Sequence, residues 1–196
     1  MKQDIIESGA IYHIFNQGNN KENIFIEEKN YYYFLYLIKK YLLPIADIYC
    51  YCLLKNHFHL LLKVKDLADL PEKFKTKPYL PFSNLFNAYA KSINKAYNRT
   101  GSLFKEHLQR NRVADEKYLI QLVAYIHLNP VKHQFTENYK NYPYSSYSAY
   151  FSQKETNINR NYILSLFENL ENFEYWHDLK KIKYAGIIED IESYDN

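Results

Sequence analysis

The sequence predicts an α+β fold of the ferredoxin-like (split βαβ) type, in which helices pack on an antiparallel sheet. Three observations support this class. Segments typical of strands and helices follow one another in the order β-α-β-β-α-β-α. Only Lys55 and Asn56 separate the second strand from the third, which favours a hairpin. Hydrophobic residues make up 47% of the 196 residues, enough to bury a core.

The first half of the predicted fold is a strand, a helix and a hairpin. Residues 10–17 form the first strand, which ends at a turn rich in Gly and Asn. Residues 27–42 carry apolar side chains at helical spacing, and Pro44 follows them. Residues 45–54, rich in β-branched and aromatic side chains, are expected to pair with residues 57–64.

The second half begins with a long loop over residues 65–82, where three prolines alternate with charged residues. The remaining segments are a helix from Ser83 or Asn84 to 97, a strand within 103–113, a helix over 115–128 that stops at Asn129 and Pro130, an aromatic loop over 141–148, and short helices over 161–167 and 173–183. We therefore expect one domain over residues 1–150 and a helical extension, 151–196, packed on that domain.

Composition and charge limit the class of protein. No apolar run reaches the roughly 18 residues of a membrane span, and the N-terminus lacks the apolar core of a secretory signal. Cys50 and Cys52 lie two apart on a strand, a spacing that favours neither a disulfide nor a zinc site. We therefore expect a soluble, cytoplasmic protein.

The net charge is +3, and the last 47 residues hold nine acidic against five basic side chains, so the basic excess lies before Tyr150. Such a body suits a phosphate-rich partner, and it equally suits an ordinary solvated surface.

The sequence His57-Phe58-His59 is the clearest local signal. Side chains alternate along a strand, so both imidazoles point to one face, about 6–7 Å apart along the backbone, while Phe58 points to the other. Two imidazoles so placed can bind one cation. The alternative is a half-buried strand that shows two histidines to solvent.

A second set lies on the helix after Asp115. Tyr125 and Asn129 are four residues apart and share a helix face, which Tyr118 joins seven residues earlier. A phenol and a carboxamide above a metal held by two imidazoles would form a phosphoryl-transfer site. Spacing alone does not distinguish Tyr125 from Tyr118, and it also allows a tyrosine in the core and an asparagine as a helix C-cap.

Several blocks together resemble the HUH single-tyrosine transposases, and most of all their REP-associated branch. In chain order, these blocks are residues 12–20 (YHIFNQGNN), 54–59 (LKNHFH), 98–104 (NRTGSLF), 125–132 (YIHLNPVK) and 142–147 (YPYSSY). The resemblance implies an enzyme that cuts and rejoins single-stranded or hairpin DNA through a 5′-phosphotyrosine. It implies that Tyr125 is the nucleophile, that His57, His59 and Asn129 are the metal ligands, and that the metal is Mg²⁺ or Mn²⁺.

Basic residues near the expected site are candidates for contacts with phosphate: Lys91, Lys95, Arg99, Lys105, Arg110, Arg112 and Lys132. Tyr142, Tyr144 and Tyr147 could stack on unpaired bases or pack the C-terminal segment onto the body. The expected partners are therefore DNA and no membrane, with the protein acting as a monomer or a homodimer.

Two other functions are considered. A non-cleaving relative would bind hairpin DNA or structured RNA without any reaction. A metal-assisted hydrolase would activate a water with a general base, for which Glu106 and Glu116 are the nearest acids. Such a hydrolase would form no covalent adduct with DNA.

Overall fold

The computed structural model describes residues 5–105 and 108–184, and it contains a four-stranded sheet. The strands are β1 (Ile11–Gln17), β2 (Ala46–Leu54), β3 (His57–Val64) and β4 (Gln109–Val113). The helices are α1 (Glu28–Tyr41), α2 (Glu72–Lys75), α3 (Leu80–Ala96), α4 (Glu116–Lys132), α5 (Arg160–Leu166) and α6 (Leu170–Tyr184). Three short 3₁₀ segments are η1 (Asn19–Lys21), η2 (Tyr139–Asn141) and η3 (Tyr147–Phe151).

The strands lie in the order β2-β3-β1-β4, and each neighbouring pair is antiparallel. The β2–β3 hairpin turns at Lys55 and Asn56, as the sequence predicts. The α+β class is confirmed, and the strand order is compatible with the split βαβ topology. In the described part of the chain, no helix is long and apolar enough to cross a membrane.

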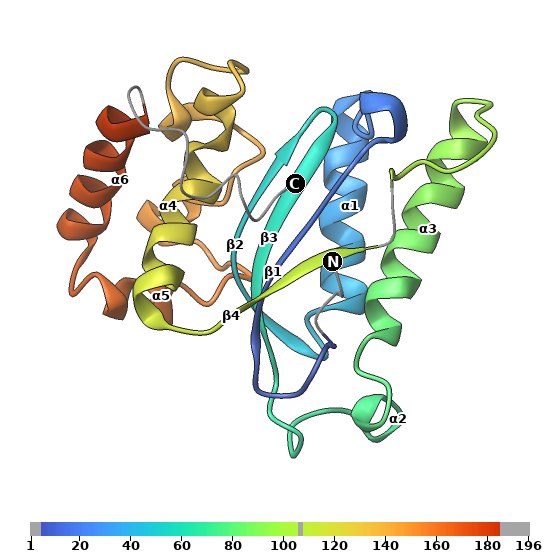
Figure 1. Cartoon of the computed structure of the whole chain (residues 1–196), viewed down its shortest axis with the longest axis horizontal. Coiled ribbons are helices and arrows are strands. Elements are labelled where there is room, and N and C mark those ends of the chain that lie inside the picture. The colour runs from blue at the N-terminus through green and yellow to red at the C-terminus, as the bar shows by residue number, and fades with distance from the viewer. Residues whose placement is uncertain (1–4, 106–107, 185–196) are drawn as a thin grey trace.

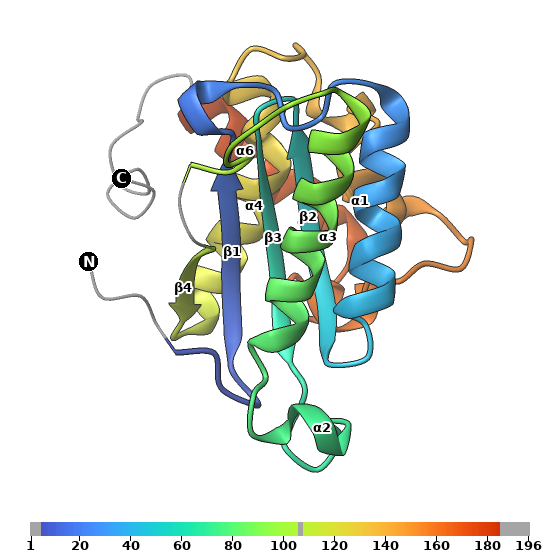
Figure 2. The ribbon, with the colours of Figure 1, turned by 90° about the vertical axis from the view of Figure 1, so that its right-hand side faces the viewer.

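Helices cover both faces of the sheet (Figure 1). Helices α1 and α3 lie on one face, as Figure 2 shows, and α4, α5 and α6 lie on the other. The alternation along each strand divides the side chains between two cores. On β3, Phe58 and Leu60 enter the core under α1 and α3, whereas Leu61 enters the core under α4. The histidines of β3 therefore face α4.

Before α4, the structure differs from the expected elements in three places. Helix α3 begins at Leu80 rather than near Ser83, because Pro81 is tolerated in a first turn, where its missing N–H has no helical partner. The loop before it contains the single-turn helix α2. Strand β4 covers only the end of the 103–113 segment, since Leu103 and Phe104 are buried in the core under α1 and α3.

The prediction that α4 stops at Asn129 and Pro130 is wrong, since the helix continues to Lys132. Pro130 lies in the last turns, so few backbone bonds remain for it to disrupt. The His133 N–H still bonds to the Asn129 carbonyl (2.9 Å), and the helix closes where Gln134 adopts a positive φ of 58°. This C-terminal closure, rather than the proline, ends the helix. Asn129 is consequently an interior residue and not a C-cap.

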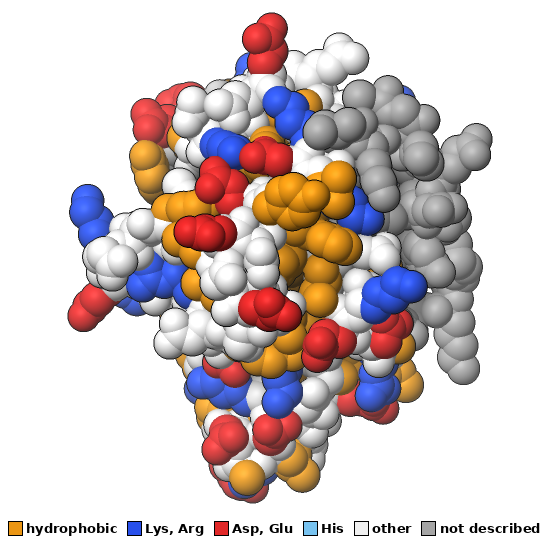
Figure 3. Space-filling view, turned by 90° about the vertical axis from the view of Figure 1, so that its left-hand side faces the viewer, with side chains coloured by type: hydrophobic (Ala, Val, Ile, Leu, Met, Phe, Trp, Pro, Cys, Tyr) orange, Lys and Arg blue, Asp and Glu red, His pale blue; other side chains and the backbone are white. Residues whose placement is uncertain are grey.

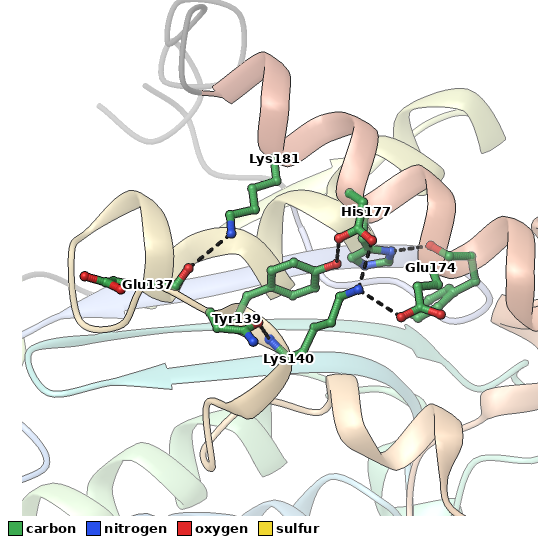
Figure 4. A network of polar contacts seen from close by, with 9 residues as sticks. Glu137, Tyr139, Lys140, Glu174, His177 and Lys181 are labelled. Atoms are coloured by element: carbon green, nitrogen blue, oxygen red, sulfur yellow. Dashed lines mark hydrogen bonds and ion pairs between the residues drawn. The ribbon is translucent and has the colours of Figure 1, made fainter.

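Helix α6 is joined to η2 through polar contacts. Lys140 bonds to Glu174 (2.9 Å) and Asp178 (2.8 Å), and the Tyr139 hydroxyl donates to Asp178 (2.6 Å), as drawn in Figure 4. The outer face of this layer, shown in Figure 3, mixes hydrophobic side chains with charges of both signs. The segment after residue 150 thus packs against α4 and η2.

A buried chain of hydrogen bonds connects α6, α4 and β2. His127 Nδ1 lies 2.9 Å from His177 Nε2, and His127 Nε2 lies 2.8 Å from the Ser146 hydroxyl. His177 Nδ1 lies 2.7 Å from the Phe173 carbonyl, which can only accept. One proton arrangement satisfies all three contacts with both rings neutral: Ser146 donates to His127, His127 to His177, and His177 to Phe173. Ser146 Oγ also accepts the Tyr51 N–H (2.9 Å) and lies 3.1 Å from the Tyr51 carbonyl, which shares the hydroxyl proton with His127; these contacts tie the chain to β2.

We expect Ser146→Ala to lower the free energy of unfolding by about 1–3 kcal/mol, because it leaves a buried ring nitrogen of His127 and the Tyr51 N–H unpaired. Urea denaturation measures the change. The matched control is Ser148→Ala, since Ser148 is exposed, and it should change stability by less than about 0.5 kcal/mol. Equal stability of the two variants would contradict this account of the buried hydrogen bonds.

Candidate active site

The two histidines of β3 lie together at the start of the strand. His57 and His59 share the face that meets α4, and their ring centroids are 5.4 Å apart with the planes nearly perpendicular. In the sheet register, His57 opposes Gln17 and His59 opposes Phe15 of β1. The expectation that alternation places both imidazoles on one face is therefore met by the backbone.

Each imidazole is oriented by a neighbouring polar side chain. His57 Nδ1 lies 2.8 Å from the Asn56 Oδ1 atom, and His59 Nδ1 lies 3.0 Å from His13 Nε2. Because Asn56 Oδ1 only accepts, His57 carries its proton on Nδ1 and keeps a lone pair on Nε2. That Nε2 atom is buried and has no hydrogen-bond partner. The bond that His57 donates to Asn56 therefore leaves an imidazole lone pair on the side that faces α4.

Helix α4 brings the phenol and the carboxamide to these histidines. The Tyr125 ring packs edge-on against His59, with centroids 5.6 Å apart, and against His13 at 6.4 Å. One turn later, Asn129 Nδ2 donates to the Tyr125 carbonyl (3.0 Å). This bond leaves Asn129 Oδ1 buried and without a partner. The i, i+4 spacing on α4 thus places both groups over β3.

The unpaired atoms at this position suit a divalent cation. His57 Nε2 and Asn129 Oδ1 are both lone-pair donors, and a buried polar atom without a partner costs about 1–3 kcal/mol unless something binds it. Nitrogen and neutral oxygen donors are compatible with Mn²⁺, and oxygen donors with Mg²⁺. Within the described ranges, no cluster of three His, Cys, Asp or Glu side chains is placed to hold a metal.

Burial keeps both histidines uncharged. It lowers the pKa of His57 to about 3, with further lowering from the charge of His133 and a smaller opposing effect of Asn129. Burial also holds the pKa of His59 well below its usual range, helped by the neighbouring His13 and His57. Neutral imidazoles are the form that binds metals. At neutral pH neither ring therefore needs to lose a proton before it can bind a cation.

Two further residues at the C-terminal end of α4, Lys132 and the C-cap His133, lie beside the same side chains. The Lys132 ammonium lies 3.5 Å from the Tyr125 hydroxyl and 4.8 Å from the centre of its ring. The His133 ring lies 4.6 Å from that of His57. Both residues reach the site because α4 continues through Pro130. A lysine ammonium beside a phenol favours the phenolate form by its charge.

The other predicted phosphate-binding residues lie outside this cluster. Lys91 and Lys95 are exposed on α3, across the sheet. Arg99 forms an ion pair with Glu22. The remaining three are placed as follows: Lys105 is exposed and its N–H bonds to the Gln17 carbonyl (2.9 Å), while Arg110 and Arg112 on β4 stand in register with the buried Ile14 and Tyr12, on the face away from α4.

The alternative nucleophile and the acid that the structure describes lie away from the histidines. Tyr118 lies seven residues before Tyr125, which is about 10 Å along the helix axis. Glu116 is exposed in the first turn of α4, still farther away, and Glu106 lies outside the described residues.

The aromatic loop packs onto the body: Tyr144 stacks on Tyr31 with ring centroids 3.6 Å apart. In the same loop, the Tyr142 hydroxyl donates to the Leu53 carbonyl (2.9 Å), and Tyr147 is buried.

Sequence reasoning missed His13 and His133. The signal for His133 was present, since it lies four residues after Asn129 and eight after Tyr125, but the expected helix end at Pro130 excluded it. His13 lies on β1, and only the pairing of β1 with β3 brings it to His59.

Known proteins that are similar to this chain carry the name of the family that the sequence motifs resemble. The chain matches no family model. A Haemophilus influenzae protein, named as a candidate REP-associated tyrosine transposase, is 29% identical over 104 residues, which cover 49% of this chain and 56% of that relative. The chain thus matches little more than half the length of that relative.

A solved structure of a REP-associated tyrosine transposase bound to a REP hairpin superimposes with a TM-score of 0.57 and 15% identity, over 78% of this chain and 85% of that one. At this identity the superposition shows a shared fold. The resemblance to the REP-associated tyrosine transposases that the sequence predicts is confirmed.

We expect the protein to lose stability in acid before its carboxylates titrate. The pKa of His57 is lowered to about 3 and that of buried His177 to about 4, so below pH 6.5 the unfolded chain takes up protons that the folded chain refuses. Each such proton lowers the free energy of unfolding by about 1.4 kcal/mol per pH unit between pH 6.5 and the folded pKa. Urea denaturation with a chelator at pH 7, 5.5 and 4.5 measures the slope.

His57→Gln should make that slope shallower by about one proton. A free energy of unfolding that stays constant from pH 7 to 4.5 would contradict the burial of neutral imidazoles.

Proposed function

We propose that this protein cuts and rejoins single-stranded DNA at hairpin-associated sites, with Tyr125 as nucleophile and a divalent cation held by His57, His59 and Asn129. The observation that carries the proposal is the meeting of these four side chains. The Tyr125 ring packs on His59, and the neighbouring Asn129 and His57 each offer a buried atom without a partner. A protein that only bound DNA would not need all four.

The similarity to transposases supports DNA as the substrate. The solved neighbour carries a REP hairpin, and the curated relative is named for the same class of enzyme. The basic excess of the chain before Tyr150 suits a phosphate-rich partner in the cytoplasm. Lys132 is the basic residue placed to meet a phosphate at the site, because its ammonium lies beside the Tyr125 hydroxyl.

Mg²⁺ or Mn²⁺, when bound, would neutralise charge on the scissile phosphate and polarise it. His57 would present Nε2, its Nδ1 being held by Asn56. His59 would present Nε2, since its Nδ1 lies 3.0 Å from His13 Nε2. Asn129 would present Oδ1, because its Nδ2 is bound to the Tyr125 carbonyl. Three donors are thus oriented by hydrogen bonds on their far sides.

Tyr125 then performs the covalent step. Its phenolate oxygen attacks phosphorus, the bond from phosphorus to the 3′ oxygen breaks, and the 3′ oxygen takes a proton from water. The products are a 5′-phosphotyrosine and a 3′-hydroxyl. An ordinary tyrosine has a pKa near 10, so the reaction depends on nearby positive charge, and the Lys132 ammonium at 3.5 Å supplies it. Attack by a 3′-hydroxyl on the phosphotyrosine reseals the strand, and no nucleotide cofactor is needed.

The reaction can be completed within one chain. Tyr125 contacts His59 of its own chain, so the geometry requires no tyrosine from a second copy. We propose that the monomer is the active unit.

Tyr125→Phe should abolish the covalent protein–DNA adduct and leave hairpin binding within about 2-fold, because only the attacking oxygen is lost. The assay incubates protein and Mn²⁺ with end-labelled DNA hairpins that carry randomised single-stranded flanks, and resolves adducts on a denaturing gel. Tyr118→Phe is the matched control and should keep the adduct. An adduct formed by Tyr125→Phe would rule out this nucleophile. Cleavage without an adduct would favour a water-activating hydrolase, and binding without cleavage would favour a non-cleaving protein.

Metal binding can be measured without DNA. A cation bound at about 100 times its Kd stabilises the folded state by about 2.7 kcal/mol, so Mn²⁺ should raise the Tm by several degrees. His57→Ala removes one donor and should abolish most of this rise. The control is reversal by excess chelator. An equal rise in the two proteins would place the Mn²⁺ elsewhere.

A further inference from the structure

One aromatic side chain of the sheet stands beside the candidate site and belongs to neither core. Phe15 lies on β1 and is the register partner of His59. Its ring stacks on His13, with centroids 4.8 Å apart and planes 28° apart, and its centroid lies 6.2 Å from that of His59. Phe15 therefore packs against the pair formed by His13 and His59, and the Tyr125 ring packs against the same pair.

The surroundings of Phe15 are polar and partly open. Its side chain is partly exposed, whereas the neighbouring residues of β1 on the opposite face, Ile14 and Asn16, are buried. Across the strands it is flanked by His59 on β3 and Gln109 on β4, and Gln17 follows on the same face. The two hydrophobic cores of the described chain are built from other side chains.

A partly exposed apolar ring beside the site gains free energy when a flat ligand covers it. Leaving part of a phenyl ring in water forfeits about 25 cal/mol for each Å² that remains exposed. The flat face of a nucleobase is a suitable cover, since stacking of an unpaired base on an aromatic side chain contributes about 1–3 kcal/mol. The phosphate proposed to lie at His57 and His59 would bring its attached nucleosides to this side of the site.

We propose that Phe15 is the stacking platform for an unpaired base next to the scissile phosphate, and that it helps to select the phosphodiester that is cut. This inference rests on the proposed function, since it assumes that single-stranded DNA enters the site. A platform of this kind favours bases with a large π face, so a purine should be preferred at the stacked position. The other role open to Phe15 is to shield the His13–His59 hydrogen bond from water.

The test measures coupling between the side chain and one base. The protein is the Tyr125→Phe variant, so that binding is measured without cleavage. The probe is a fluorescent DNA hairpin with short single-stranded tails, in which each tail nucleotide is replaced in turn by an abasic site. At one position, loss of the base should weaken binding by about 10-fold. In the protein that also carries Phe15→Leu, the same abasic probe should bind within about 2-fold of the intact one.

Two further variants make the result specific. Phe15→Trp keeps an aromatic face and should keep the abasic penalty, which a shielding role alone would not produce. Phe151→Leu alters a 38% exposed phenylalanine on η3 and should leave the penalty unchanged. The proposal is overturned if no tail position shows a penalty, or if Phe15→Leu retains the full penalty.

Cleavage and base stacking have different readouts. Failure of the wild-type protein to form any adduct would contradict the proposed cleavage, while the binding cycle on Phe15 could still succeed. A normal adduct assay together with a penalty that ignores Phe15 would contradict only the stacking role.

Discussion

The packing of helix α4 against the sheet is the constraint on which the rest of the site depends. Every residue from Leu122 to Pro130 is buried, between strands on one side and the C-terminal helices on the other. A helix that is buried all round cannot rotate or slide without opening a core. The helical period of 3.6 residues places Tyr125 and Asn129 on the face of α4 that lies over β3. The strand period of two residues places His57 and His59 on the face of β3 that lies under α4. Two regular elements with different repeats thus position four polar side chains.

The same burial determines the chemistry. Removal from water keeps the imidazoles neutral and strengthens any charge interaction within the site. It also leaves His57 Nε2 and Asn129 Oδ1 without partners, at a cost in stability. Such a cost is expected where a protein is organised for a ligand rather than for maximal stability. The hydrogen bonds that do form engage Asn56, His13 and the Tyr125 carbonyl, and they leave His57 Nε2 and Asn129 Oδ1 available to a ligand.

Local pattern was sufficient for most of the fold. The β2–β3 hairpin and the placement of both histidines on one face followed from alternation and from a two-residue polar break, which depend on neighbours in sequence. The end of α4 did not follow from local pattern. Whether a helix continues past a proline near its terminus depends on tertiary burial, and here the helix closes at Gln134. His13 and Phe15 could not be assigned to the site from sequence, since strand pairing brings them to His59. The choice of Tyr125 over Tyr118 came from the family resemblance and stays a prediction. The structure places the Tyr125 ring beside His59 and His13.

A crystal structure with Mn²⁺ bound tests the central claim most directly. Anomalous scattering locates the ion without assumptions about its ligands. The account predicts one strong peak about 2.0–2.3 Å from His57 Nε2, His59 Nε2 and Asn129 Oδ1, with the Tyr125 hydroxyl turned toward the ion. A peak bound by other side chains, or a fully occupied ion that leaves Asn129 Oδ1 without a partner, would contradict it.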